Sequence, residues 1–251
     1  MAASDHPIEV RGLTLAYGEF VVQRDLDFSV RRGDVFIVMG ASGCGKTTLL
    51  RHMVGLMQPL QGEVFYDGEP FWAASAAQRH RLIRRFGVMF QGGALWSSMT
   101  LAENVSLPLE EYTDLPAAAV REIASLKLAL VGLGGFEDYY PAEISGGMQK
   151  RAGIARAMAM DPEILFLDEP SAGLDPISSR RLDELILELR DSLGATVVVV
   201  THELPSIFAI GNDSIFLDEE ARTMIGGGDP RSLRDDEASH EKVRRFLRRE
   251  A

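Results

Sequence analysis

The sequence is poor in cysteine and in long apolar runs, and each shortage excludes a class of protein. Its 251 residues contain one cysteine, Cys44, which excludes an internal disulfide and fits a reducing compartment. Apolar runs such as 197–200 are far shorter than the roughly 18 residues that suggest a spanning helix. Residues 1–7 show no basic stretch followed by an apolar core, so no signal peptide is expected. We therefore expect a chain that does not itself cross a membrane.

Positive charge is also scarce. Lysine and arginine total 26 against 37 aspartates and glutamates, so the net charge is −11. Binding to a phosphate backbone normally needs surplus positive charge, so a broad nucleic-acid-binding face is not expected and we predict no nucleic-acid partner. Hydrophobic residues make up 46% of the chain, enough for one large domain or two small ones with a substantial core.

Three short apolar segments, each followed by a polar or glycine-rich motif, are typical of buried strands. They are 35–39 before a glycine-rich loop, 164–167 before Asp168-Glu169, and 196–201 before His202. Continuous runs of this kind fit central parallel strands that are covered on both faces. Ligands of such sheets bind at the carboxyl ends of the strands, so we expect the three motifs to converge on one site.

Helices are predicted between these strands. One helix covers 46–57 and another 178–193, in which Leu182, Leu185, Ile186, Leu189 and Leu193 share one stripe and Gly194 follows as a carboxyl-terminal cap. The strand–helix alternation indicates an α/β fold.

The remaining segments suggest two additions to this core. Residues 8–15 and 21–30 alternate like antiparallel strands joined by a turn around Gly18. Residues from about 95 to about 160 look mainly helical. They include a helix at 116–131, with Val120, Ile123, Leu126 and Leu130 as its apolar stripe, and a helix from Gly146 to about Ala159. We therefore predict an α/β P-loop (RecA-like) core with an antiparallel β subdomain and an inserted α-helical subdomain.

The glycine-rich loop is the most specific motif. Residues 40–47 read GASGCGKT and match G-x-x-x-x-G-K-[ST] in full, with an apolar strand before and a helix after. Its backbone N–H groups can surround phosphate, helped by the dipole of the following helix. Lys46 can reach the β- and γ-phosphates, and the Thr47 hydroxyl can ligate Mg²⁺. The predicted nucleotide-binding residues here are Gly40, Ala41, Ser42, Gly43, Cys44, Gly45, Lys46, Thr47 and Thr48.

Polar residues at neighbouring strand ends complete a candidate hydrolytic site. Asp168 is suited to holding Mg²⁺ through water, and Glu169 to accepting a proton from an attacking water or orienting it. Gln91, after the apolar segment 86–90, and His202 are placed to contact the γ-phosphate or its water. A lone Gln or His at a strand end is more often structural, but the shared edge favours function here. We predict Glu169, His202 and Gln91 as catalytic residues, and Thr47, Gln91 and Asp168 as metal ligands.

A second helix start resembles an anion site. Ser145 is a natural amino-terminal cap, and Gly146 and Gly147 leave backbone N–H groups accessible. On its own this is also the pattern of any capped helix. One chain cannot easily place two such starts on one γ-phosphate, which suggests that this start binds nucleotide on another subunit.

Taken in order, these motifs resemble the nucleotide-binding subunits of ABC transporters over nearly the whole chain. The order is Tyr17, the phosphate loop, Gln91, the signature at 144–148, the strand 164–169, the turn at 171–175 and His202. The resemblance implies an ATP-hydrolysing enzyme that uses ATP and Mg²⁺ as a homodimer. It further implies that Tyr17 stacks on adenine and that Asp175 lies in the dimer-interface loop. Ser145 and Gly147 would then bind the γ-phosphate held by the partner subunit.

The finer resemblance is to the ATPases that serve Mce-domain (Mla-type) lipid transporters. It rests on the segments 90–100 and 201–208 and on Met148 of the signature, which departs from the commonest form at Ile144 and Met148. It implies a bacterial subunit at the cytoplasmic face of the inner membrane that powers movement of phospholipid or other hydrophobic molecules between membranes. Its partners would be multi-span permease subunits and an Mce-domain protein. Transport of an amino acid, metal or drug, or a soluble non-transport role, are the alternatives.

Two stretches allow more than one interpretation. Residues 94–101, with Leu95, Trp96, Met99 and Leu101, either line a groove for a permease helix or form the core of the helical subdomain. We divide the chain into an ATPase domain at 1–230, with the helical insertion at about 95–160, and an amphipathic helical tail at 231–251. The apolar face of that tail docks on its own domain, on a partner subunit or on anionic lipid.

Overall fold

The computed structural model describes residues 4–250. Its strands are Ile8–Tyr17 (β1), Phe20–Val30 (β2), Val35–Gly40 (β3), Gln61–Tyr66 (β4), Glu69–Pro70 (β5), Phe86–Met89 (β6), Ile164–Asp168 (β7), Thr196–Val200 (β8), Asp213–Asp218 (β9) and Thr223–Gly227 (β10). Its helices are Lys46–Met53 (α1), Ala76–Ile83 (α2), Leu101–Tyr112 (α3), Ala117–Leu130 (α4), Pro141–Glu143 (η1), Gly146–Ala157 (α5), Pro176–Leu193 (α6), Leu204–Ile210 (α7), Pro230–Asp235 (α8) and Glu241–Arg248 (α9).

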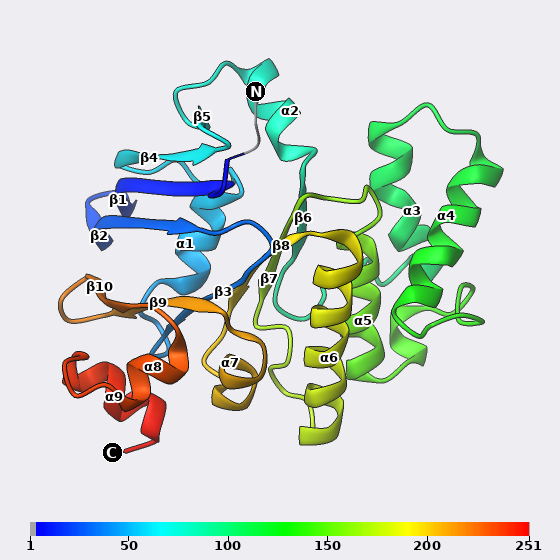
Figure 1. The fold of residues 1–251 in the computed structure, drawn as a ribbon. Coiled ribbons are helices and arrows are strands. Elements are labelled where there is room, and N and C mark those ends of the chain that lie inside the picture. Colours follow the sequence, from blue (N-terminus) through cyan, green and yellow to red (C-terminus); the bar gives the residue numbers. More distant parts are fainter. Residues whose placement is uncertain (1–3, 251) are drawn as a thin grey trace.

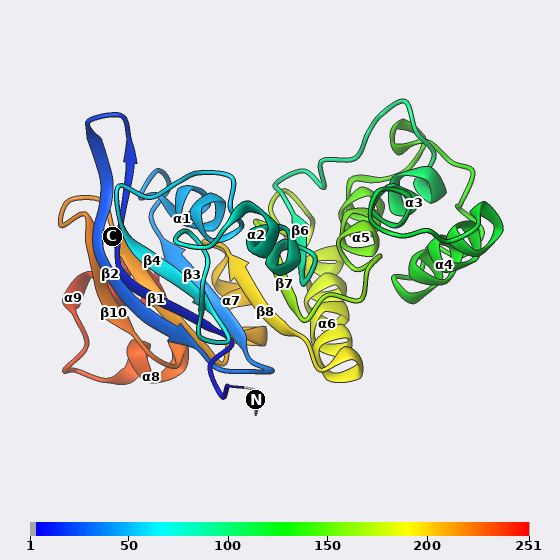
Figure 2. The same ribbon diagram turned by 90° about the horizontal axis from the view of Figure 1, so that it is seen from above.

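Two sheets organise these elements. Within residues 4–250, the central sheet has the strand order β10-β9-β3-β8-β7-β6 and is parallel except for β10, which pairs antiparallel with β9. The smaller sheet, β2-β1-β4-β5, is antiparallel throughout. Figures 1 and 2 show this smaller sheet at one end of the molecule and helices α3 and α4 at the other. The predicted α/β core with an antiparallel β subdomain and a helical insertion is confirmed.

Alternate residues of the central strands enter two separate apolar cores. In β3, Ile37 and Met39 pack on the side of the helical insertion, whereas Phe36 and Val38 pack toward the antiparallel sheet. The strands β7 and β8 divide in the same way, and all of their residues are buried. This burial on both faces is why the strands consist of continuous apolar runs rather than an alternating pattern.

Helix α1 follows the glycine-rich loop and packs between the two sheets. Its Leu49, Leu50 and Met53 join the core that includes Leu13 and Leu15 of β1. The helix ends at Met53, so the prediction that it runs to residue 57 is wrong. The chain turns away instead, with Gly55 at a φ of 84°.

Helices α3, α4 and α5 form the insertion and share the core on one face of the central sheet. The expected stripe of α4 is only partly right, because Leu126 and Leu130 are exposed. Ala124 and Leu128 are buried in their place, since they lie one and two turns beyond the buried Val120. Helix α5 also stops at Ala157, two residues before its predicted end.

Helices α6 and α9 contribute buried residues to this same core. Four of the five predicted stripe residues of α6 are buried, whereas Leu193 at its last turn is exposed, and Gly194 caps the helix with a φ of 64°. Helix α9 buries Val243 and Leu247 in the core of its own chain. None of the helices within residues 4–250 has the length and hydrophobicity that crossing a membrane requires.

Candidate functional site

The glycine-rich loop joins β3 to α1 and accepts only glycine at two of its positions. Gly40 has a φ of 149°, and a Cβ atom there would lie 2.4 Å from the carbonyl oxygen of Leu217. Gly45 has a φ of 103°, and a Cβ atom there would lie 2.7 Å from Cγ1 of Val22. These close approaches let the backbone turn tightly into the amino end of α1, where its N–H groups and the helix dipole favour an anion.

Lys46, the first residue of α1, folds back onto this loop. Its Nζ donates to the carbonyl oxygens of Gly40, at 3.0 Å, and Ala41, at 2.9 Å. Two of the three donors of the ammonium are thereby used, and the third is available to a further acceptor. The side chain is buried, whereas Ala41, Ser42 and Gly43 of the loop are exposed.

Thr47 and Asp168 meet across the ends of neighbouring elements. Thr47 Oγ1 donates to Asp168 Oδ1 at 3.0 Å. Burial raises the pKa of Asp168 above its ordinary value, with the Glu169 carboxylate adding to the effect and the Thr47 hydrogen bond opposing it. A hydroxyl and a carboxylate side by side match the oxygen ligands that Mg²⁺ takes from proteins beside substrate phosphates.

Gln91 lies beyond β6, at the same edge of the sheet, with an exposed side chain. Within residues 4–250 it makes no hydrogen bond, so the structure does not bring its amide onto Thr47 or Asp168.

Glu169 and His202 form the closest polar pair at the sheet edge. His202 Nδ1 lies 2.7 Å from Glu169 Oε1, and since a carboxylate only accepts, the imidazole donates through its Nδ1–H. Glu169 Oε2 is buried without a hydrogen-bond partner within residues 4–250. Glu169 also has a φ of 48°, which is strained for a residue with a side chain. The carboxylate of Glu169 is therefore oriented by His202 through one oxygen, and its other oxygen has no partner among the described residues.

A lysine that the sequence reasoning missed stands behind this carboxylate. Lys150, in the first turns of α5, is buried and its Nζ donates to the backbone oxygen of Glu169 at 3.0 Å. Burial lowers the pKa of Lys150, against the opposing effect of the Glu169 and Asp168 charges. A lysine two residues after Met148 carries no local signal of burial, because only the packing of α5 on the end of β7 encloses it.

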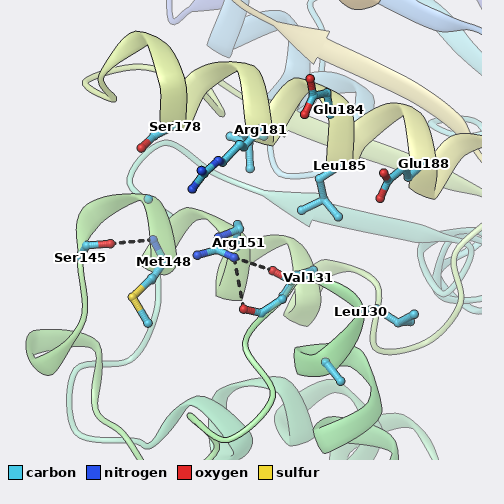
Figure 3. A pocket seen from close by; sticks show the side chains of 14 residues that line it. Leu130, Val131, Ser145, Met148, Arg151, Ser178, Arg181, Glu184, Leu185 and Glu188 are labelled. Atoms are coloured by element: carbon cyan, nitrogen blue, oxygen red, sulfur yellow. Dashed lines mark hydrogen bonds between the residues drawn. The ribbon is translucent and has the colours of Figure 1, made fainter.

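Ser145 begins α5 as predicted, and its hydroxyl accepts from the Met148 N–H at 3.3 Å. The signature residues border a cleft of about 520 Å³ between α5, the end of α4 and α6 (Figure 3). No residue of the phosphate loop lines this cleft. Helices α1 and α5 belong to the two different apolar cores, and both ribbon views show strands β6 and β7 between them (Figures 1 and 2).

Three further residues take the following places. Tyr17 is about half exposed, with its hydroxyl 3.3 Å from Thr48 Oγ1. Asp175 caps α6 by accepting from the N–H groups of Ile177 and Ser178, at 3.0 Å each. The Cys44 thiol is buried, and burial raises its pKa.

Comparison with known proteins agrees with this geometry. The family model described as ABC transporter matches residues 23–172, more than half of the chain. The protein named intermembrane phospholipid transport system ATP-binding protein MlaF is 36% identical in Haemophilus influenzae, over 97% of this chain and 91% of that protein. In Escherichia coli K12 it is 37% identical, over 96% and 88%. The Mycobacterium tuberculosis protein named probable ribonucleotide transport ATP-binding protein Mkl is 43% identical over 78% of this chain, which spans only 55% of that relative's length.

Solved structures agree as well. CbiO1 from Clostridium perfringens, part of the ABC transporter complex CbiONQ, has a TM-score of 0.82 and 26% identity over 92% of this chain and 91% of its own. A dimeric ATP-binding cassette in a post-hydrolysis state, bound to ADP and Pi, has a TM-score of 0.79 and 29% identity over 88% and 97%. The family model covers more than half of the chain and the MlaF relatives cover nearly all of it, so the chain belongs to the ABC transporter family.

Proposed function

We propose that this chain is the ATP-hydrolysing subunit of a bacterial ABC transporter that moves phospholipid or other hydrophobic molecules between membranes. The ATPase part is carried by one observation, the Glu169–His202 pair beside the Thr47–Asp168 contact and the phosphate loop. The cargo is supported by the MlaF relatives, which match nearly the whole chain and most of their own length.

Glu169 is the proposed general base. Its Oε1 is engaged by His202, so the unpartnered Oε2 is the atom available to take a proton from an attacking water. His202 orients the carboxylate and is half exposed, so it can also contact a γ-phosphate. Burial of Glu169 limits its contact with bulk water and keeps its orientation fixed.

Lys46, Thr47 and Asp168 are the proposed phosphate and metal residues. Lys46 would bring its free donor to a phosphate oxygen, and Thr47 and Asp168 would hold Mg²⁺, with Gln91 as a further ligand once its exposed side chain turns inward. Magnesium, when bound, neutralises the charge that develops on the transferred phosphoryl group. Tyr17 would stack on the adenine, since its ring is exposed beside Thr48.

The signature residues support a homodimer. Ser145, Gly146 and Gly147 open α5 apart from the phosphate loop of the same chain, so their N–H groups are available to a nucleotide on a second copy. Asp175, at the exposed start of α6, would lie in the interface between the copies. The dimeric neighbour with ADP and Pi supports this arrangement.

Membrane subunits complete the proposed assembly. Closure and reopening of the dimer would drive multi-span permease subunits, with an Mce-domain protein as a further partner, and the chain would lie peripherally at the cytoplasmic face of the inner membrane. Trp96, which is 58% exposed, is the proposed permease contact on the helical insertion.

A ribonucleotide cargo is the second candidate, because the name of the Mkl relatives specifies ribonucleotide transport. Since the match spans only about half of their length, we favour lipid.

The test is purification of the tagged Glu169→Gln protein from membranes in mild detergent, with mass spectrometry of the polypeptides and lipids that accompany it. We expect a multi-span permease, an Mce-domain protein and phospholipid. A permease without lipid or Mce-domain protein would overturn the cargo but keep the ATPase. Recovery with ribosomes or DNA alone would overturn the transporter.

A further inference from the structure

A buried acid on α6 takes no part in the site described above. Asp183 is only 5% exposed, and its Oδ2 accepts a hydrogen bond from the hydroxyl of Ser206 on α7 at 2.9 Å. Its other oxygen, Oδ1, is buried without a hydrogen-bond partner within residues 4–250. A buried carboxylate in this state costs folding free energy, so it needs an explanation.

Ser206 connects this acid to the loop that follows Glu169. Ser206 Oγ lies 3.2 Å from the hydroxyl of Ser171, and both serines are buried. Each hydroxyl has one proton, and Ser206 uses its own on the Asp183 carboxylate, so Ser171 must be the donor to Ser206. The ionised acid thus sets the direction of a chain that runs from Ser171 through Ser206 to Asp183.

This series of hydrogen bonds joins the loop after β7 to the start of α7, where the backbone ladder of the sheet has ended. The last backbone bond that joins the ends of β7 and β8 runs from the N–H of Glu169 to the oxygen of Val200, at 2.8 Å. Beyond it, within residues 4–250, the side-chain bonds between the loop after β7 and the segment 201–206 are the Glu169–His202 pair and the Ser171–Ser206 contact. Ser171 is two residues after Glu169, and Ser206 is four residues after His202.

We propose that Asp183 is a positioning residue for ATP hydrolysis, which orders the Ser206–Ser171 contact and thereby holds the loops of Glu169 and His202 in register. The inference rests on the proposed catalytic role of that pair. Asp183 touches neither nucleotide nor reacting water, and acts only through the two serines.

The pKa of Asp183 agrees with a carboxylate that is ionised and accepts from Ser206. Burial raises the pKa of Asp183 to about 6, the Ser206 hydrogen bond opposes the effect, and Glu184 on the same helix adds to it. Helix α7, which packs against it, contains no titratable side chain. Within residues 4–250, the charged group that shifts this pKa is the acid Glu184, and no cation opposes it. With a pKa of about 6, the carboxylate is largely ionised at neutral pH.

The experiment measures kcat and KM for ATP with the full-length chain carrying Asp183→Leu, Asp183→Asn or Ser171→Ala, and Glu188→Gln as a control. Glu188 is an exposed acid on the same helix. Loss of the Ser171–Ser206–Asp183 hydrogen bonds should lower kcat about tenfold in Asp183→Leu and Ser171→Ala. The KM for ATP should stay within about twofold of the wild-type value. The asparagine variant keeps an acceptor for Ser206 and should recover part of the rate, and the control should match the wild type.

Repeating the Asp183 substitution in a variant that lacks His202 separates a positioning role from a general loss of structure. In His202→Ala, measured by single turnover, Asp183→Leu should cause no further loss, because the contact that it positions is gone. An unchanged kcat in both the leucine and alanine variants, or an equal fractional loss in the presence and absence of His202, would overturn the proposal. Glu169→Gln is assayed alongside. If Glu169→Gln hydrolyses ATP at the wild-type rate, the catalytic assignment of Glu169 is wrong. If Glu169→Gln is inactive but Asp183→Leu has the wild-type rate, only the positioning role of Asp183 is refuted.

Discussion

Replacing Asp183 by asparagine should stabilise the protein at neutral and alkaline pH. Asparagine has nearly the same shape, and its side-chain oxygen can accept from Ser206 as the carboxylate Oδ2 does. The substitution removes a buried negative charge that no cation compensates. In place of Oδ1 it leaves a buried amide N–H, which costs about 1–2 kcal/mol and does not depend on pH.

The size of the effect follows from the pKa of Asp183, which rises from 3.8 for a free carboxyl to about 6 in the folded protein. At about 1.36 kcal/mol per pKa unit, ionised Asp183 costs the folded state about 3 kcal/mol. The folded state binds the proton more tightly, so the free energy of unfolding falls as the pH rises from about 4 to about 6 and is constant above. About half of this cost is already present at pH 5, so a change of about 1 kcal/mol remains between pH 5 and pH 8.

Urea unfolding of the wild type and of Asp183→Asn at pH 5 and pH 8 measures this difference. We expect the free energy of unfolding of the variant, relative to the wild type, to increase by about 1 kcal/mol from pH 5 to pH 8. Glu188→Gln, on the exposed face of the same helix, should show no such change. If Asp183→Asn and the wild type respond identically to pH, Asp183 is not buried as an isolated charge and the reasoning is refuted.

Three other variants or modifications test the site and its surroundings. Glu169→Gln should slow hydrolysis by about 10²- to 10⁴-fold while leaving ATP binding intact, and equal turnover would remove Glu169 as the base. Cys44 should react slowly with an alkylating reagent in the folded protein because its thiol is buried and its pKa raised. Once complete, alkylation should block ATP binding, and nucleotide titration of the labelled protein checks this. Trp96→Ala should uncouple transport without slowing basal ATPase; an unaffected transport rate would place the permease contact elsewhere.

The sequence was sufficient where one local pattern determined both structure and chemistry. The strands β3, β7 and β8 are continuous apolar runs because both faces are buried, and each leads directly into a motif. The hairpin of β1 and β2 was predicted from its alternation, and Gly18 at the turn has a φ of 60°. Such features depend on neighbouring residues alone.

Features that depend on tertiary packing were predicted less well. Helix α4 has apolar residues on several sides, so periodicity alone did not distinguish the buried Leu128 from the exposed Leu126 and Leu130. Lys150 and Asp183 were missed because charged residues on amphipathic helices are normally exposed. Their burial arises from elements distant in the sequence, β7 for the lysine and α7 for the acid.

Three energetically costly features of this fold lie at or near the proposed site. The strands β3 and β7 are apolar up to their carboxyl ends, and these costly features begin there. Asp168 has a pKa raised by burial, Glu169 has a strained backbone and a carboxylate oxygen without a partner, and Asp183 carries an uncompensated charge. Under the proposed function, the first two are explained by the Mg²⁺ that Asp168 would hold and the water that Glu169 would activate. Asp183 has no such contact, so its cost is accounted for only if it acts through Ser206 on the loops that carry the reacting groups.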